Sequence, residues 1–212
     1  MRGRLGDVRH FAEVVISEFP ALAVHYPILF SRQAETGRFF AGAVMGFYPG
    51  ENLFFPSPRG QHIYLPLSLQ REPFFISGDN LAVDLEHPLV DREDGEPLFD
   101  EDREPTAHLK SVQSALTQLK FGIEATDTFI SSLLELKLVE PIDISLSFDN
   151  GDRCRLEGLY TVSNDRLQDL SDGQVLDLFR QGYLQLAYSM IGSLKQLSLL
   201  TRKRNERLLE DG

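Results

Sequence analysis

Apolar residues along the first 86 positions fall in short runs or alternate with polar residues, which is typical of β-strands. Seven prolines between positions 20 and 73 are too frequent for helices longer than about two turns. The expected strands lie in AEVVISEF (12–19), GRFFAGAVMGFY (37–48), IYLPLSL (63–69), PFFIS (73–77) and NLAVDLE (80–86). The pattern predicts a β-rich half over 10–86, built mostly of antiparallel strands.

From residue 106 onward, apolar residues recur at spacings of three and four, which is the period of an amphipathic helix. We expect Thr106 to cap a helix that begins with AHLKSVQSALTQLKFG, because a threonine side chain can accept a hydrogen bond from a free amide of the first turn. Gly122 is expected to interrupt this helix and Pro141 to end its continuation.

The segments IDISLSF and RCRLEGLYTV form the clearest hairpin of the chain, at 142–162, because Asn150-Gly151 between them suits a tight turn. Beyond it, Ser171 can cap a short helix, and residues 183–209 are predicted as one long amphipathic helix. We therefore expect a helical C-terminal half with an inserted β-hairpin.

Together these elements predict an α+β fold in a single domain over 1–212. Its parts are the β-rich segment 10–86, an acidic connector over 87–105 and a helix–hairpin–helix segment over 106–209. Residues 86–104 hold nine carboxylates against two arginines, so this stretch should be solvated and extended. A calcium loop is the alternative, but the carboxylate spacing does not match that of an EF-hand.

The charge and the reactive residues narrow the function classes. A net charge of −11 disfavours a nucleic-acid partner. No histidine pair, P-loop, nucleotide-binding glycine motif or hydrolase serine motif occurs, so we predict no metal and no cofactor. The single cysteine, Cys154, excludes an intramolecular disulfide, and it is either a buried small side chain or a thiol activated by the neighbouring arginines.

The N-terminal segment lacks the uninterrupted apolar core of a signal peptide, and nowhere do about 18 apolar residues run together. We therefore expect a cytoplasmic protein with no membrane span.

One polar cluster stands out in the apolar first half. Its candidate ligand-binding residues are His25, Tyr26, Glu51, Asn52, Tyr64 and Arg71. If consecutive strands are neighbours, these groups converge on one sheet edge. Arg71 could then form a buried salt bridge with Glu51, or it could hold a carboxylate of a ligand or peptide.

Seven segments resemble the bacterial SapC family, in the order and register of that family. They are HYPILF (25–30), GENLF (50–54), YLPLSLQREPF (64–74), GEPLFDEDREPT (95–106), LVEP (138–141), LEGLYTV (156–162) and GYLQLAYSMIGSLKQL (182–197). The resemblance implies a soluble protein with no established catalytic activity. It also implies relatives that are often encoded near TonB-dependent receptors, tryptophan-halogenase-like proteins and cupin-like or JmjC-like proteins.

These observations favour a non-enzymatic accessory protein that binds a protein or peptide partner, in an uptake or peptide-modification pathway. An apolar face on the C-terminal helix also makes a homodimer through that helix an expectation. One alternative is an enzyme or small-molecule binder with a pocket around His25, Glu51 and Arg71. A second alternative is the surface-layer role from which the family takes its name.

Overall fold

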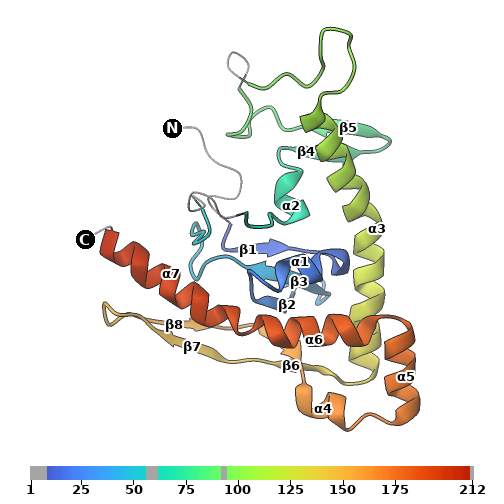
Figure 1. The fold of residues 1–212 in the computed structure, drawn as a ribbon, viewed down its shortest axis with the longest axis vertical. Helices are drawn as coiled ribbons and strands as arrows, with labels where there is room; N and C mark the ends of the chain where they lie inside the picture. Colours follow the sequence, from blue (N-terminus) through green and yellow to red (C-terminus); the bar gives the residue numbers. More distant parts are fainter. Residues whose placement is uncertain (1–8, 56–61, 92–94, 211–212) are drawn as a thin grey trace.

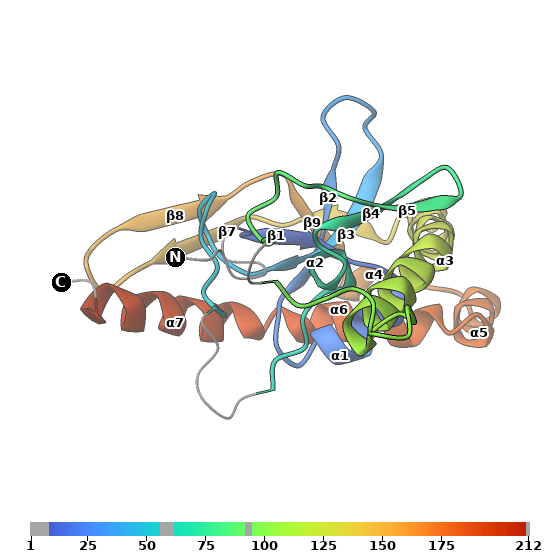
Figure 2. The same cartoon turned by 90° about the horizontal axis from the view of Figure 1, so that it is seen from above.

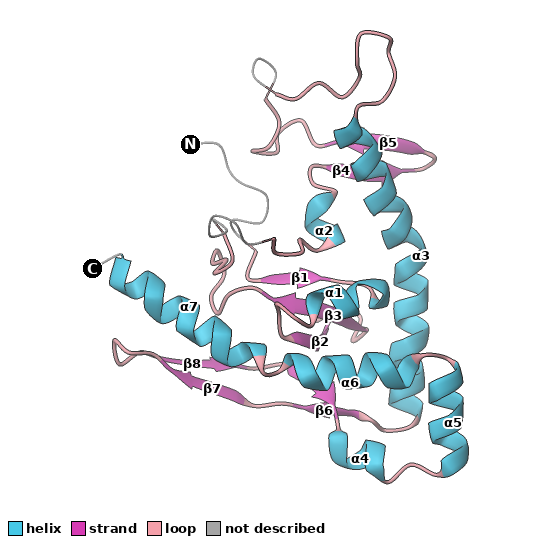
Figure 3. Cartoon of the chain, in the orientation of Figure 1, coloured by secondary structure: helices cyan, strands magenta, loops and turns pink. Residues whose placement is uncertain are grey.

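The computed structural model describes residues 9–55, 62–91 and 95–210 of the chain. It shows the α+β fold expected from the sequence, with strands in both halves and the longer helices in the second half (Figure 3). No helix within the described ranges is both long and apolar enough to cross a membrane.

A five-stranded antiparallel sheet lies at the centre of the molecule (Figure 1). Its order is β1 (Phe11–Glu13), β3 (Phe39–Val44), β2 (Ile28–Arg32), β9 (Leu159–Val162) and β6 (Val139–Pro141). Two of these strands, β9 and β6, come from the C-terminal half of the chain. They join the sheet where Phe30 of β2 pairs with Tyr160 of β9. The sheet therefore joins the two halves of the chain.

The predicted hairpin is present but shorter than expected. β7 (Ile144–Ser147) pairs with β8 (Arg153–Leu156), and Gly151 in the turn has a positive φ of 88°. The expected second strand is divided at Gly158, whose φ of 72° is in the left-handed region that favours glycine. This bend releases the chain from the hairpin and allows β9 to enter the central sheet.

The long helix α3 (Ala107–Glu135) contacts the sheet at β3 and extends for about 43 Å at 1.5 Å per residue. Thr106 caps it as predicted, accepting a hydrogen bond from the Leu109 amide at 3.4 Å. The expected interruption at Gly122 is wrong, since α3 runs through this residue and packs there against Val15. The helix also ends before Pro141, which lies in β6.

Two further predictions in the β-rich half are wrong. The segment 12–19 turns into the 3₁₀ helix η1 (Ile16–Glu18) and the single-turn helix α1 (Phe19–Leu22) after β1. The expected strand over 63–69 contains instead the one-turn helix α2 (Leu67–Gln70). The frequency of proline correctly predicted that helices in this half would be short. Apolar content alone did not distinguish these short helices from strands.

The predicted long C-terminal helix is divided in two. α4 (Asn164–Gln168) and α5 (Asp172–Arg180), which Ser171 caps as predicted, precede α6 (Tyr183–Ser193) and α7 (Gln196–Glu210). Ser193, at the break, is fully buried, and its hydroxyl donates to the Met190 carbonyl and accepts from the Ile28 amide at 2.9 Å. This side chain competes with helical hydrogen bonding and attaches the end of α6 to β2.

The remaining hairpin, β4 (Phe74–Ser77) and β5 (Asn80–Val83), lies beside the N-terminal end of α3, away from the central sheet (Figures 1 and 2). Its apolar side chains form a small second core with that end of α3, made of Phe74, Val83, Leu98, Leu109, Val112 and Leu116. The main core lies between the sheet and α1, α3 and α6.

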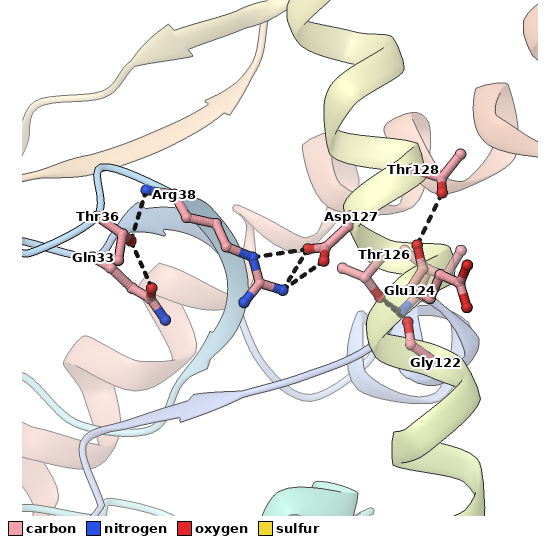
Figure 4. A network of polar contacts seen from close by, with 9 residues as sticks. Gln33, Thr36, Arg38, Gly122, Glu124, Thr126, Asp127 and Thr128 are labelled. Carbon is pink, nitrogen blue, oxygen red and sulfur yellow. Dashed lines mark hydrogen bonds and ion pairs between the residues drawn. The ribbon is translucent and has the colours of Figure 1, made fainter.

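An exposed ion pair attaches the β2–β3 turn to α3 (Figure 4). Nε and Nη2 of Arg38 both donate to the Asp127 carboxylate, and the shortest of these hydrogen bonds is 2.6 Å long. One residue earlier, the Thr126 hydroxyl donates to the Gly122 carbonyl and accepts from the Ile16 amide at 3.0 Å. These contacts fix the sheet and the N-terminal segment against the middle of α3.

Candidate functional site

The polar cluster predicted from the sequence is divided in the structure. His25 and Tyr26 lie in the turn before β2, with ring centroids 6.1 Å apart. Burial lowers the pKa of His25. Tyr26 is fully buried, and its hydroxyl donates to the Tyr64 carbonyl at 2.9 Å. Tyr26 and Tyr64 are therefore brought together, but as a structural contact between two loops.

Glu51 and Asn52 hold the loop over 46–55 in place. The Glu51 carboxylate accepts from the Phe47 amide at 2.7 Å and forms an ion pair with Arg204 of α7 at 3.0 Å. The Asn52 side-chain oxygen accepts from the Phe54 amide at 3.0 Å. Gly50 turns this loop with a φ of 85°. Both predicted polar groups thus serve the loop itself.

The helix α7 makes further contacts with the same loop. Arg207 donates to two backbone carbonyls, those of Asn52 at 2.9 Å and Phe55 at 2.8 Å. Lys203 lies over the Phe54 ring at 5.2 Å from its centroid. The basic end of α7, which the sequence showed only as charges near a helix terminus, therefore binds an internal loop.

The predicted salt bridge between Glu51 and Arg71 is wrong, because Glu51 pairs with Arg204. Arg71 follows α2 and donates to the Phe74 carbonyl at 2.8 Å, so it belongs to the base of the β4–β5 hairpin. A partner more than 150 residues away in the sequence has no local signal, which is why spacing alone selected the nearer arginine.

Sequence reasoning missed the most buried carboxylate described, Glu18, which is 2% exposed. It accepts from the Leu67 amide at 2.7 Å, the Val15 amide at 3.0 Å and the Tyr64 hydroxyl. Burial raises the pKa of Glu18. Burial, together with the charge of the nearby Glu18, raises the pKa of Tyr64 to about 12. Glu18 lies in an apolar segment, and the spacing of the residues around it did not indicate a buried carboxylate.

The structure contains a pocket of about 400 Å³ between the β4–β5 hairpin, the following loop and the first turn of α3. The small second core supplies its floor through Phe74, Val83 and Leu98, and the loop supplies its wall through Leu85, Leu89 and Val90. This is a mainly apolar concavity of the size that small ligands and single side chains occupy.

Glu72 lines the pocket and is already neutralised by the protein. Its carboxylate pairs with Arg9 at 2.9 Å and lies 3.9 Å from Nε2 of His87. The other ring nitrogen of His87 accepts a hydrogen bond from the Leu89 amide at 3.2 Å, so the proton of the neutral imidazole is on Nε2, facing Glu72. Both groups therefore hold the pocket wall.

Besides Glu72, three ionisable groups line the pocket, namely His108, Asp91 and Glu96, whereas His87 stands beside it. The His108 ring lies on the first turn of α3 beside Phe74, with centroids 6.3 Å apart. Among the described residues, no three histidine, cysteine or acidic side chains gather as they would around a metal ion. The arrangement is suited to holding an apolar group with a polar rim around it.

Cys154 lies elsewhere, on β8, and is buried. Burial raises the pKa of its thiol, although a hydrogen bond with Tyr48 opposes this effect. The structure supports a small semi-buried side chain at this position, because an activated cysteine requires a lowered pKa.

Comparison of the chain with curated proteins and with solved structures found no match. Comparison with models of protein families matched the SapC family over residues 3–200. This match spans the central sheet, both hairpins, α3 and the pocket, so it covers the segments on which the resemblance rested. The chain belongs to the SapC family.

Proposed function

We propose that this SapC-family protein is an accessory binding protein, and that the pocket beside the β4–β5 hairpin receives an apolar group of a partner molecule. The observation that carries the proposal is the pocket itself, with about 400 Å³ of space and an apolar floor and wall. Known ligand pockets occupy a similar range of volumes and have the same mainly apolar lining.

The pocket combines a fixed floor with an exposed edge. Phe74 in the floor is 4% exposed and is supported from below by Leu109 and Val112 of α3. Leu85 at the edge is 58% exposed, so its apolar surface is left in water when the pocket is empty. Covering such a side chain with an apolar group is favourable by roughly 25 cal/mol for each Å² removed from water.

Two ionisable groups at or beside the pocket are engaged by the protein itself, which favours binding over catalysis. A general base needs a free lone pair directed at the substrate, but Nδ1 of His87, which stands next to the lining residue Pro88, accepts from a backbone amide. Glu72 is engaged by Arg9. The alternative site around His25, Glu51 and Arg71 has less support, because Glu51 pairs with Arg204 and Arg71 lies with the hairpin.

The cellular setting in this proposal follows from the family resemblance and the sequence. We propose a cytoplasmic protein that serves a TonB-receptor-linked uptake or peptide-modification pathway through a protein or peptide partner. A surface-layer role is the second alternative, and cell fractionation that placed the protein outside the cell would favour it.

The proposal is tested with N-phenyl-1-naphthylamine, a neutral apolar dye whose fluorescence rises in apolar surroundings. Titration should show saturable binding of one dye per chain. Leu85→Ser should weaken that binding by about tenfold, as expected for about 1.4 kcal/mol of lost apolar contact. Leu85 suits this test because its exposure limits the effect of the substitution on folding.

Leu81→Ser is the matched control, since Leu81 lies on the same hairpin, is 38% exposed and does not line the pocket. It should leave dye binding unchanged. The proposal fails if the dye does not saturate, or if the two variants weaken binding equally.

A further inference from the structure

We infer that the occupant of this pocket is a segment of a partner protein in which an apolar side chain is flanked by lysine or arginine residues. The inference rests on the proposed function and adds the chemistry of the partner. It is carried by the charge distribution around the pocket together with its apolar interior.

The loop that forms the pocket wall carries exposed and uncompensated negative charge. Seven exposed carboxylates in the described part of 84–104 form no ion pair with another described residue, namely Asp84, Glu86, Glu96, Asp100, Glu101, Asp102 and Glu104. Two of them accept backbone amides within the loop, Asp84 from Glu86 and Asp100 from Asp102 and Glu104. Their charges therefore remain available to a partner.

Two carboxylates that line the pocket differ in their surroundings within the described part of the chain, the buried Glu72 and the exposed Glu96. Glu72, whose side chain is 10% exposed, pairs with Arg9. Glu96 lines the pocket and is exposed, and no cation of the described chain pairs with it. A ligand that placed its apolar part on the floor would bring its ends to this rim, where a cation is attracted and an anion is repelled.

The extent of the surface favours a peptide segment over a small amine. Apolar side chains continue outside the pocket at Ile76, which is 48% exposed, and at Phe99, which is 55% exposed. Of the seven carboxylates without an ion pair to a described residue, only Glu96 lines the pocket, so the other six offer negative charge outside it. A segment with cations on both sides of its apolar anchor would use the pocket and the rim together.

The test is displacement of N-phenyl-1-naphthylamine from the full-length protein by blocked peptides that share a central leucine. The flanking residues are lysines in one peptide, glutamines in the second and glutamates in the third. The lysine peptide should bind at least about tenfold more tightly than the glutamine peptide, and the glutamate peptide more weakly than both. Raising salt from about 50 mM to about 300 mM should weaken the lysine peptide without affecting the dye.

Glu96→Gln should reduce affinity for the lysine peptide about two- to fivefold, as for a partly exposed charge pair. Glu101→Gln, in the same loop but outside the pocket lining, should have a smaller effect. Neither variant should change dye binding, which reports on the proposed function alone.

The outcomes separate the two ideas. If the dye binds but the three peptides displace it equally, or the glutamate peptide is the best, the inference is overturned and the proposed function stands. If decyltrimethylammonium competes as well as the lysine peptide, a small cationic amphiphile replaces the peptide and the inference is likewise overturned. Failure of the dye itself to bind overturns the proposed function.

Discussion

Glu18 connects two distant parts of the first half through one buried carboxylate. Its carboxylate joins the start of η1 to the start of α2, since the Val15 and Leu67 amides both donate to it. Only a carboxylate offers an acceptor oxygen to each of these amides at once. This buried side chain therefore stabilises the first turn of α2 by accepting from the Leu67 amide.

Glu18→Gln should lower the free energy of unfolding by about 1–3 kcal/mol, because one of the two amides loses its acceptor. Urea unfolding followed by circular dichroism measures the effect. Glu35→Gln is the control, since Glu35 is an exposed glutamate in the β2–β3 turn and should change stability by less than about 0.5 kcal/mol.

The same substitution has a pH dependence whose sign follows from the raised pKa of Glu18. A carboxyl whose pKa is higher in the folded state contributes stability that is fully present below its unfolded pKa, near 4.5, and is lost as the pH rises through the folded pKa. The destabilisation by Glu18→Gln should therefore be larger at about pH 4 than at about pH 8. An equal effect at both would contradict the raised pKa.

The Glu51–Arg204 pair should contribute more than a surface ion pair does. Its side chains are 10% and 21% exposed, so solvent screens the charges only in part. A double-mutant cycle with Glu51→Gln and Arg204→Gln should give a coupling energy of about 1 kcal/mol or more. The exposed pair Arg202–Glu206 on the same helix is the control and should give about 0.3–0.5 kcal/mol. Equal couplings would show that the partial burial has no effect.

The candidate site was predictable from the sequence only in part. The pattern selected Tyr26, Glu51 and Asn52 as candidate ligand-binding residues, and in the structure each of them has a hydrogen-bond partner within the protein, as buried polar side chains generally do. It missed Glu72, because nothing beside that residue in the sequence indicates that Arg9 and a distant loop meet there. Pockets depend on tertiary contacts of this kind.

At the scale of elements, the sequence predicted those that local chemistry determines. β4, β5 and the turn at Gly151 follow from alternation and glycine, and the start of α3 follows from Thr106. The division of the 183–209 helix was missed because its cause is the contact of Ser193 with Ile28, which the helical period does not reveal. Likewise, α2 exists where Glu18 accepts from its first amide.

The packing of α3 against the N-terminal segment makes Gly122 sensitive to substitution. A Cβ at this position would lie 2.7 Å from the Cβ of Val15, which is closer than non-bonded carbon atoms approach each other in proteins. Gly122→Ala should therefore destabilise the protein by about 1–3 kcal/mol in spite of the better helix propensity of alanine.

Gly192→Ala in α6 is the matched control, because a Cβ there meets no atom within 4 Å. It should raise stability by about 0.5–1 kcal/mol. Thermal unfolding of both variants measures the difference, and two shifts of the same sign would contradict the close contact at Gly122.

At the scale of the whole molecule, the shared sheet predicts that the two halves unfold together. β9 lies between β2 and β6, so the first half cannot complete its sheet without the second. Val162→Ala, at a buried position in β9, should cost about 2 kcal/mol. The slowest-exchanging amides of both β3 and α6 should then exchange about 30-fold faster in hydrogen-exchange mass spectrometry. Acceleration in one half only would show two independent units.

The homodimer through the C-terminal helix remains a prediction. The helix face that carries Lys203, Arg204 and Arg207 is already used by the loop over 46–55. A dimer would therefore have to use other faces of α6 and α7. Light scattering coupled to size-exclusion chromatography that showed only monomer would remove this prediction.

The small second core around Phe74 and Leu109 shares no buried side chain with the main core, and α3 is the element that reaches both. The segments 64–74 and 95–106 at this end of the molecule resemble the family, so relatives should keep Phe74 and Leu98 in the floor of the pocket. Positions 75–90 lie between these two segments, and substitutions there should leave the main core unchanged. We expect sequence divergence beside this end of α3 to concentrate at positions 75–90, where partner preference can change while the rest of the molecule is kept.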